Sequence, residues 1–296
     1  MPLYPPLRKF LELSSQFSFN DVNQMREVYK KLSLLVQKEE VGETRDIVIR
    51  GTEADIRARI YTPIVHREKY GILVYFHGGG FVFGDIETYD YLCRSITNSC
   101  ECKVVSVDYR LAPEHKFPAA VIDATDSLGW VLENMDEGLG VAVAGDSAGG
   151  NLAAVVSHTF KSKLKYQVLI YPAVGFDQTS RSMTEFSEGY FLTSEMINWF
   201  GRLYLSKESD VFDPRFSPIL FKDFKNLPPA LIITAEYDPL RDQGEAYANK
   251  LAENGVETVS IRFNGMIHGF LTIPDIPHSK SAIRIIGSTL KDAFYR

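Results

Sequence analysis

The sequence predicts an α/β fold with a mostly parallel, doubly wound sheet flanked by helices. Three observations indicate this class. Short, wholly apolar runs recur from residue 71 and alternate with helical stretches, two strands of a different pattern precede them, and no strand-like run lies between Pro172 and Leu227. Strands buried on both faces are apolar throughout, and intervening helices imply parallel pairing through right-handed crossovers. No repeat or linker divides the 296 residues, so one domain is expected over 1–296.

The first predicted element is a helix over residues 21–38. Asn20 or Asp21 can cap its amino end, because either side chain can accept a hydrogen bond from the first helical turn. Its apolar residues recur at steps of three and four, as one face of a helix requires: Val22, Met25, Tyr29, Leu32 and Val36. One side of this helix should therefore be buried.

Two strand-like stretches follow, at residues 45–50 and 55–61. In the second, Ile56, Ala58 and Ile60 alternate with charged residues, which is the period of a strand with one solvent face. The wholly apolar runs then come at residues 71–76, 103–108, 140–145, 166–171, 230–235 and 257–263. An antiparallel-looking start followed by a parallel run fits a mixed sheet.

The segment after Pro172 interrupts this alternation with a loop and a strongly amphipathic helix. Ser194 can cap the helix. One face carries an apolar stripe: Met196, Trp199, Phe200, Leu203 and Tyr204. The stripe either packs the segment onto the body of the protein or lines a pocket beneath it.

Charge and hydropathy exclude several classes of function. The net charge is −6 and no run of like charges occurs, so a nucleic-acid partner has no electrostatic basis. No segment reaches the 18 apolar residues of a spanning helix, and prolines and charges occupy the N-terminal residues where a signal peptide would be apolar. We therefore expect a cytoplasmic protein without a membrane partner.

The three cysteines, an odd number, do not suggest a disulfide framework. Cys100 and Cys102 are two residues apart, which is a poor geometry for a bridge, and a C-x-C pair without a second Cys/His pair is weak evidence for zinc. Reduced, buried or half-buried thiols and no bound metal are expected.

The strongest chemical signal is GDSAGG at residues 145–150, which contains the pattern G-x-S-x-G. A buried strand precedes it and a helix follows it, which is the context in which a serine is presented on a sharp turn as a nucleophile. Gly145 and Gly149 suit that turn because a Cβ at either position would collide with the neighbouring backbone. Ser147 is the predicted nucleophile.

A second motif, His77-Gly78-Gly79-Gly80, directly follows the strand at 71–76. Successive glycines let backbone amides approach an oxygen atom without obstruction, and HGGG is a form of oxyanion hole found in esterases. The amide after the nucleophile, here that of Ala148, completes it. We interpret His77 itself as structural, because the base of such a site comes much later in the chain.

Of the six histidines, His268 fits the base best. It follows the last apparent strand, and it comes after both the serine and the acid, as the order Ser…Asp…His requires. His115 precedes the serine, so the order excludes it. His66, His158 and His278 lie in polar sequence and are expected at the surface.

The acid should lie where a strand ends between the serine and the histidine. The run 230–235 leads into Glu236, and Asp238 is the first residue at which a proline, Pro239, enforces a turn. Asp238 is therefore the predicted acid, which would orient the imidazole of His268. Asp242 is the alternative, although it already begins the next helix.

Together these motifs resemble the hormone-sensitive-lipase-like branch of the α/β-hydrolase esterases. The matching segments are HGGGFVFGD (77–85), DYRLAPEHKFPAA (108–120), GDSAGGNLAA (145–154), EYDPLRDQGEAYA (236–248) and HGF (268–270). The resemblance implies a triad of Ser147, Asp238 and His268, and oxyanion donors at Gly79, Gly80 and Ala148. It also implies a cap formed by about 1–40 and 175–215, and dimers through the edge strand at 257–263. Phe81 stands where many members have tryptophan.

The resulting hypothesis is a serine carboxylesterase that hydrolyses short- to medium-chain esters through an acyl-enzyme, without a cofactor. An amidase or deacetylase, or a lipase, could use the same triad. A non-catalytic ligand-binding relative is a further alternative, since fold alone does not fix function. The natural ester cannot be identified from the sequence.

Overall fold

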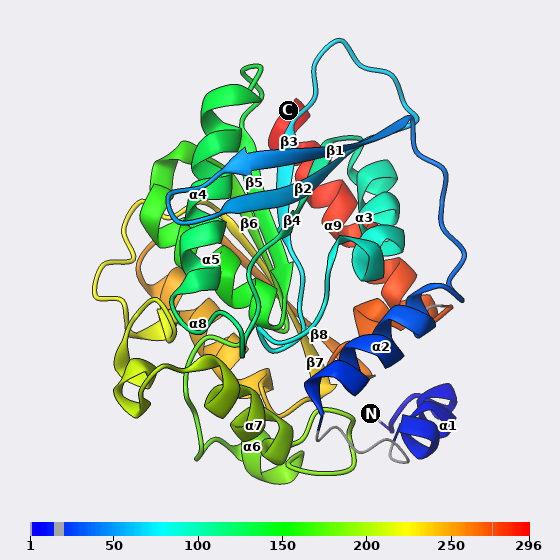
Figure 1. Cartoon of the computed structure of the whole chain (residues 1–296), viewed down its shortest axis with the longest axis vertical. Helices are drawn as coiled ribbons and strands as arrows, with labels where there is room; N and C mark the ends of the chain where they lie inside the picture. Colours follow the sequence, from blue (N-terminus) through cyan, green and yellow to red (C-terminus); the bar gives the residue numbers. More distant parts are fainter. Residues whose placement is uncertain (1, 15–20, 274) are drawn as a thin grey trace.

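A single eight-stranded sheet forms the centre of the protein (Figure 1). The structure is a computed structural model that describes residues 2–14, 21–273 and 275–296. In the described residues the strands are β1 (Glu43–Arg50), β2 (Asp55–Thr62), β3 (Ile72–Phe76), β4 (Lys103–Asp108), β5 (Val141–Asp146), β6 (Leu164–Ile170), β7 (Ala230–Tyr237) and β8 (Thr258–Ile267). Their order in the sheet is β1-β2-β4-β3-β5-β6-β7-β8. β1 pairs with β2, and β2 with β4, in antiparallel fashion, while the remaining pairs are parallel. The predicted mixed α/β sheet is confirmed.

The pairing register brings the chemical motifs to one edge of the sheet. Phe76 of β3 lies opposite Gly145 of β5, so the HGGG segment and the GDSAGG turn leave the sheet side by side. Tyr237 of β7 lies opposite Ile267 of β8, so the residues that follow these strands also emerge together. In a parallel sheet the carboxyl ends of the strands form the edge at which ligands bind.

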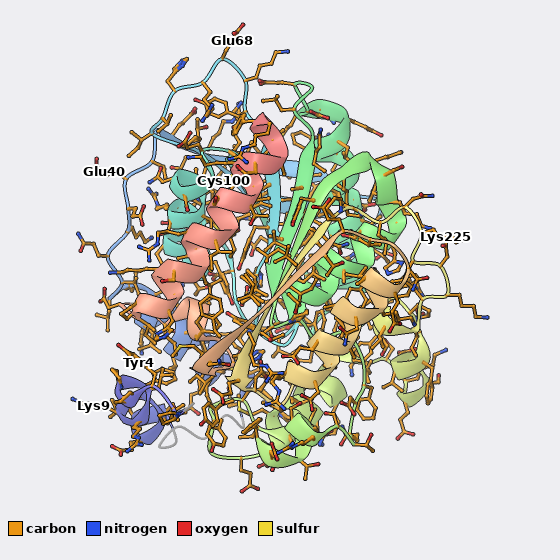
Figure 2. The ribbon with its side chains drawn as sticks, turned by 180° about the vertical axis from the view of Figure 1, so that it is seen from behind. Tyr4, Lys9, Glu40, Glu68, Cys100 and Lys225 are labelled. Carbon is orange, nitrogen blue, oxygen red and sulfur yellow. A yellow bond between two sulfur atoms is a disulfide. The ribbon has the colours of Figure 1, made fainter. Side chains whose placement is uncertain are left out.

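Helices cover both faces of the sheet (Figure 1). The described helices are α1 (Pro5–Ser14), α2 (Val22–Ser33), α3 (Ile86–Cys100), α4 (Ala119–Asn134), α5 (Ala148–Phe160), α6 (Arg181–Glu185), α7 (Ser194–Tyr204), α8 (Arg241–Glu253) and α9 (Pro277–Tyr295). Short 3₁₀ turns span Lys161–Lys163, Glu208–Phe212, Pro218–Leu220 and Phe270–Thr272. Helices α3 and α9 pack on one face, and Figure 2 shows α9 crossing that face from behind. Helices α4, α5 and α8 lie on the other face, and each face has its own apolar cluster.

No helix of the described residues is long and apolar enough to span a membrane.

The N-terminal helix is shorter than predicted. Asp21 caps α2 by accepting a hydrogen bond from the Gln24 amide at 2.8 Å, whereas Asn20 lies outside the described residues. The helix ends at Ser33 rather than at residue 38, because the chain then turns to follow α3, where Lys38 forms an ion pair with Asp90 at 2.9 Å. Val36 therefore lies beyond the helix and Leu32 is exposed, while Met25 is buried as expected.

The amphipathic helix after Pro172 is α7, and its cap differs from the prediction. Thr193 is the capping residue and accepts a hydrogen bond from the Met196 amide, while Ser194 is already the first helical residue. The sequence pattern did not predict the short helix α6. Together with α1 and α2, helices α6 and α7 lie at one end of the molecule (Figure 1).

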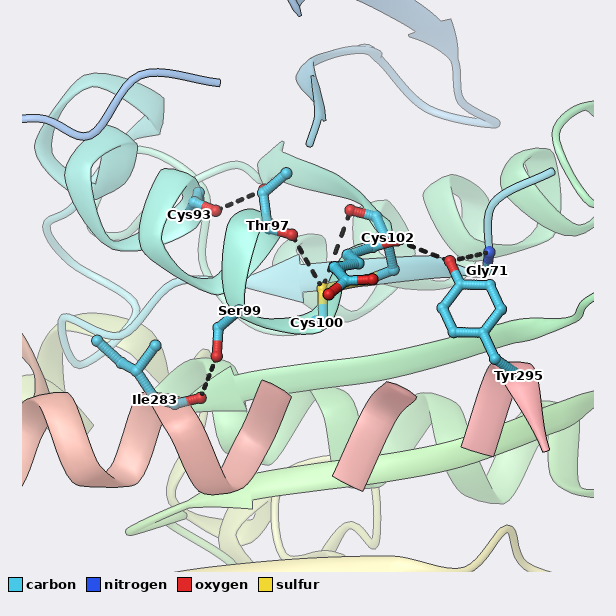
Figure 3. The surroundings of a disulfide bond; sticks show 9 residues. Gly71, Cys93, Thr97, Ser99, Cys100, Cys102, Ile283 and Tyr295 are labelled. Carbon is cyan, nitrogen blue, oxygen red and sulfur yellow. Dashed lines mark hydrogen bonds between the residues drawn. A yellow bond between two sulfur atoms is a disulfide. The ribbon is translucent and has the colours of Figure 1, made fainter. Parts of the chain in front are cut away.

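The expectation of three reduced thiols is wrong for two of them. A disulfide joins Cys100 and Cys102, and Cys93 is free and buried (Figure 3). Glu101 ends α3 in the left-handed conformation, with φ 51° and ψ 33°, which folds the chain back on itself. The two Cα atoms are consequently 5.2 Å apart, a separation that a disulfide can span. Spacing in the sequence gave no sign of this turn.

Candidate active site

The turn between β5 and α5 presents Ser147 in an unusual backbone conformation. Its φ of 54° and ψ of −115° are unfavourable for a residue with a side chain, and such backbones occur where the surrounding structure enforces them. The two glycines of the motif are necessary for this turn. A Cβ at Gly145 would lie 2.2 Å from the Gly149 carbonyl oxygen, and one at Gly149 would lie 1.9 Å from that of Phe76.

A chain of hydrogen bonds joins the serine to a histidine and a carboxylate. His268 Nε2 lies 2.9 Å from Ser147 Oγ, and His268 Nδ1 lies 2.8 Å from Asp238 Oδ2. Because the carboxylate accepts from Nδ1, Nε2 of the neutral ring is left to accept from the serine hydroxyl. Asp238 is fully buried, and its other oxygen accepts from the Leu240 amide at 2.8 Å. The three residues predicted from the sequence are thus brought together.

Asp242, the alternative acid, faces a different part of the molecule. One of its oxygens accepts a hydrogen bond from the Ser182 amide at 2.8 Å, and the other forms an ion pair with Arg241. Its carboxylate therefore joins α8 to the start of α6 and makes no hydrogen bond to His268.

The HGGG segment turns sharply beside Ser147. Gly79 and Gly80 have φ values of 116° and 60°, which glycine adopts without a steric penalty. The Gly79 carbonyl accepts from the amides of Val82 and Phe83, which closes the turn. A Cβ at Gly80 would lie 2.5 Å from the ring of Phe200, so helix α7 packs directly on this loop. Gly79, Gly80 and Ala148 line the same cavity as Ser147 and His268.

His77 and His158 are both buried. Nδ1 of His77 donates to the Gly78 carbonyl at 2.7 Å, its ring stacks on Tyr109, and burial lowers its pKa to about 4. The expectation that His158 is a surface residue is wrong, because its ring stacks on Phe221 and hydrogen-bonds Tyr247 at 3.0 Å. His158 points into the core from α5, which a polar sequence context did not indicate. His66 is exposed and His278 half-buried.

The cavity above Ser147 has a volume of about 770 Å³, within the usual range of small-molecule sites. Met196, Phe200 and Tyr204 of α7 line it, whereas Trp199 and Leu203 do not border it. The apolar stripe of α7 is therefore divided between lining the cavity and packing the helix. In the described part of the chain, no three His, Cys, Asp or Glu side chains are grouped so that they could hold a metal ion.

Two residues of this region were missed by sequence reasoning. Asp146, within GDSAGG, is buried and accepts hydrogen bonds from Tyr75 and Tyr89, and burial raises its pKa to about 6. Its place inside the motif was the available signal. Arg26 of α2 donates to the carbonyls of Val82 and Ala112 at 2.9 Å each. It thereby fastens the N-terminal helix to the end of the HGGG turn, a long-range contact for which the sequence has no marker.

Comparison with known proteins agrees with this fold. The model of a family described as alpha/beta hydrolase fold matches residues 73–272. An arylesterase of Saccharolobus solfataricus is 44% identical, over 99% of this chain and 100% of that protein. The carboxylic ester hydrolase LipN of Mycobacterium tuberculosis is 43% identical over 78% of this chain and 65% of its own length.

Solved structures are equally similar. A hyperthermophilic esterase from Pyrobaculum calidifontis superposes with a TM-score of 0.94 at 48% identity, covering 99% of both chains. A thermostable carboxylesterase cloned from a metagenomic library superposes with a TM-score of 0.89 at 42% identity, covering 95% of this chain and 100% of that one.

Proposed function

The chain belongs to the α/β-hydrolase fold family and is a carboxylesterase of the hormone-sensitive-lipase-like type, and we propose that Ser147, His268 and Asp238 carry out its catalysis. The observation that supports this assignment is the continuous hydrogen-bonded chain from the serine hydroxyl to a buried carboxylate, at 2.9 Å and 2.8 Å. Ser147 and His268 border a cavity of a size suited to a small molecule. Small esters are the substrates.

In the proposed reaction His268 Nε2 takes the hydroxyl proton as Ser147 Oγ attacks the ester carbonyl. The negative charge that develops on the carbonyl oxygen is stabilised by the amides of Gly79, Gly80 and Ala148. Ala148 is the first residue of α5, so its amide belongs to the end of the helix that has no internal hydrogen-bond partner. His268 then protonates the departing alkoxide, and water, activated by the same ring, releases the acid from the acyl-enzyme.

Replacing the nucleophile tests this mechanism. Ser147→Ala should lower kcat for an activated ester at least on the order of ten-thousandfold, as knockouts of a serine triad do. The thermal unfolding midpoint should stay close to that of the wild type, since only one hydroxyl is removed. Retention of a tenth of the activity in pure protein would refute the assignment of Ser147.

We also propose that the enzyme prefers short to medium acyl chains. Each methylene group buried in an apolar pocket contributes about 0.8 kcal/mol until the pocket is full. The cavity is bounded on the cap side by Phe200 and Tyr204, both of which are buried, so its length is finite. Long-chain triglycerides in emulsion should be poor substrates.

The assembly of the molecule is likewise a proposal. We infer that α1, α2, α6 and α7 form one cap, corresponding to about 1–40 and 175–215. We also infer that β8 pairs with its copy in a homodimer, because it is the last strand in the sheet and Val259 is 46% exposed. Analytical ultracentrifugation tests the dimer. Cytoplasmic residence stays a prediction, and the disulfide between Cys100 and Cys102 removes the cysteine count as support for it.

A further inference from the structure

We propose that Asp146 is a positioning residue that holds the oxyanion loop against the nucleophile turn through its side-chain hydrogen bonds. The oxyanion loop is defined here as His77–Phe83. The inference rests on the proposed roles of Ser147 and of the glycine amides. Asp146 ends β5 and directly precedes Ser147, so its backbone moves with the nucleophile while its side chain reaches the neighbouring strand.

The carboxylate of Asp146 accepts hydrogen bonds from three elements. Oδ1 accepts from the Gly78 amide and from the Tyr75 hydroxyl of β3, both at 2.9 Å. Oδ2 accepts from the Tyr89 hydroxyl of α3 at 3.0 Å, and the Gly78 amide also lies 3.1 Å from that hydroxyl. Gly78 is the residue immediately before the two glycines whose amides would face the oxyanion. The orientation of its peptide group therefore sets where those amides point.

The fit between the loop and the carboxylate is close. A Cβ at Gly78 would lie 2.4 Å from Asp146 Oδ2 and 2.9 Å from the Tyr89 hydroxyl, so only glycine allows this approach. The other side of the loop is held as well, because the Tyr109 hydroxyl donates to the His77 carbonyl at 2.7 Å. A carboxylate with 2% exposure retains its charge only when hydrogen bonds replace its water, and two hydroxyls and one amide do so here.

The ionisation of Asp146 falls in an accessible pH range. Burial raises its pKa to about 6, against the effect of the hydrogen bonds from Tyr75 and Tyr89. The titratable groups that interact electrostatically with Asp146 are Tyr75, Tyr89, Tyr91, Cys93, Tyr109, Tyr171 and His268. When the Asp146 carboxylate takes up a proton, one of its oxygens becomes a hydrogen-bond donor, although the groups around it, the Gly78 amide and the hydroxyls of Tyr75 and Tyr89, are donors already. The hydrogen bonds that orient Gly78 must therefore rearrange.

The chain offers a matched control at another buried carboxylate. The Tyr61 hydroxyl donates to Asp90 at 3.0 Å, and both side chains are buried. Asp90 is held by Lys38, Arg59 and Arg94, and neither its carboxylate nor the Tyr61 hydroxyl hydrogen-bonds the oxyanion loop. Tyr61→Phe therefore removes the same kind of hydrogen bond as Tyr89→Phe without removing one from the Asp146 carboxylate.

The test compares Asp146→Asn, Tyr89→Phe and Tyr61→Phe with the wild type. The measurements are kcat and KM for an activated acetate ester, inhibition by a trifluoromethyl ketone that forms a tetrahedral serine adduct, and thermal unfolding. Asp146→Asn and Tyr89→Phe should lower kcat on the order of ten- to a hundredfold, less than loss of a whole oxyanion donor costs, with KM within about twofold. Inhibitor affinity should weaken in parallel. Tyr61→Phe should lower the unfolding midpoint to a similar extent and leave kcat within about twofold.

The acid side of the pH profile gives a second, independent measurement. In the wild type, log kcat/KM should fall more steeply below about pH 6 than in Asp146→Asn, because only the wild type has a carboxyl group at this position that takes up a proton there. Unchanged kcat in both site variants, or acid limbs of equal steepness in the two proteins, would overturn the proposal. If Ser147→Ala is inactive in the same assays, the proposed function stands while this inference fails. If Asp146→Asn does not fold, the kcat and the inhibitor affinity of Tyr89→Phe still test the proposal.

Discussion

Two carboxylates four residues apart, Asp238 and Asp242, have different environments that the sequence distinguishes only through the position of Pro239. Asp238 is fully buried against His268, whereas the side chain of Asp242 is 28% exposed and anchors α6. The turn after β7 directs the first carboxylate to the ligand-binding edge of the sheet, and the start of α8 turns the second away. Asp238 therefore has a proposed catalytic role, whereas Asp242, four residues later, has a structural one.

Asparagine substitutions at these two positions should differ in effect. Asp238→Asn is expected to lower kcat about ten-thousandfold, because the amide no longer fixes the required tautomer of the histidine. Asp242→Asn should keep kcat within a few-fold and lower only the stability, since it loses a partly exposed ion pair. Steady-state kinetics with an activated ester measure both. A comparable loss in the two variants would contradict the assignment of the acid.

The proposed catalytic residues could be identified from the sequence because local rules apply to them. The strand–GDSAGG–helix pattern and the chain order of the triad identify Ser147 and His268 without any tertiary information. Asp146 and His158 could not be assigned in the same way. Their roles depend on which side chains from distant segments surround them, Tyr75 and Tyr89 in one case and Phe221 and Tyr247 in the other.

At the scale of elements, the strands followed the sequence more closely than the helices did. Strands β3 to β7 are short, mostly apolar runs that are buried on both faces, and β2 shows the alternation of a strand with one solvent face. All eight strands appear near their predicted ranges. The N-terminal helix ends five residues earlier than predicted because the chain after Ser33 turns along α3, where Lys38 forms an ion pair with Asp90. Helix α6 was missed because its five residues are too few to show a period.

Helix α7 has two kinds of apolar residue on one stripe. Phe200 borders the cavity and packs over Gly80, whereas Trp199, its neighbour on the same helix, is half-buried and does not border the cavity. Substitutions at these two positions therefore test the shape of the pocket and the packing of helix α7 separately.

Alanine at these two positions should give different specificities. Phe200→Ala is expected to shift the preferred acyl group toward longer chains, because it lengthens the cavity. Trp199→Ala should lower the unfolding midpoint and leave the preference unchanged. The ratio of kcat/KM values across esters from acetate to palmitate measures the shift. The same optimum in both variants, or a shift in Trp199→Ala alone, would show that the lining is assigned to the wrong residue.

For the molecule as a whole, buried carboxylates act on stability in opposite directions. Burial raises the pKa of Asp146 from 3.8 to about 6, so between these values the folded protein binds more proton at this site than the unfolded chain does. The free energy of unfolding contributed by Asp146 therefore falls as pH rises through this window. At Asp90 burial acts in the same sense, but hydrogen bonds from Lys38 and Arg94 lower the pKa, so its contribution is lost as pH falls.

This difference should appear in the stability of two variants measured against pH. The unfolding free energy of the wild type minus that of Asp146→Asn should decrease from pH 4 to pH 7, by on the order of 3 kcal/mol. The same difference for Asp90→Asn should increase with pH on the acid side. Denaturant titrations at a series of pH values measure both. Curves with the same sign would show that folding does not raise the pKa of Asp146.

An exposed turn before β8 separates the chain into two segments, and the proposed catalytic residues are shared between them. The two segments meet where β8 pairs with β7. Gly255 lies in that turn, with no atom near the position of a Cβ, and such loop tips tolerate breaks in the backbone. The piece before it carries Ser147 and Asp238, and the piece after it carries β8, His268 and α9. Neither fragment could hydrolyse an ester alone, because the base and the nucleophile are on different polypeptides. Hydrolysis would return only when β8 of the shorter fragment pairs with β7 of the longer one. With an ester that releases a coloured product, the rate of colour formation would therefore measure how much of the enzyme split at Gly255 has reassembled.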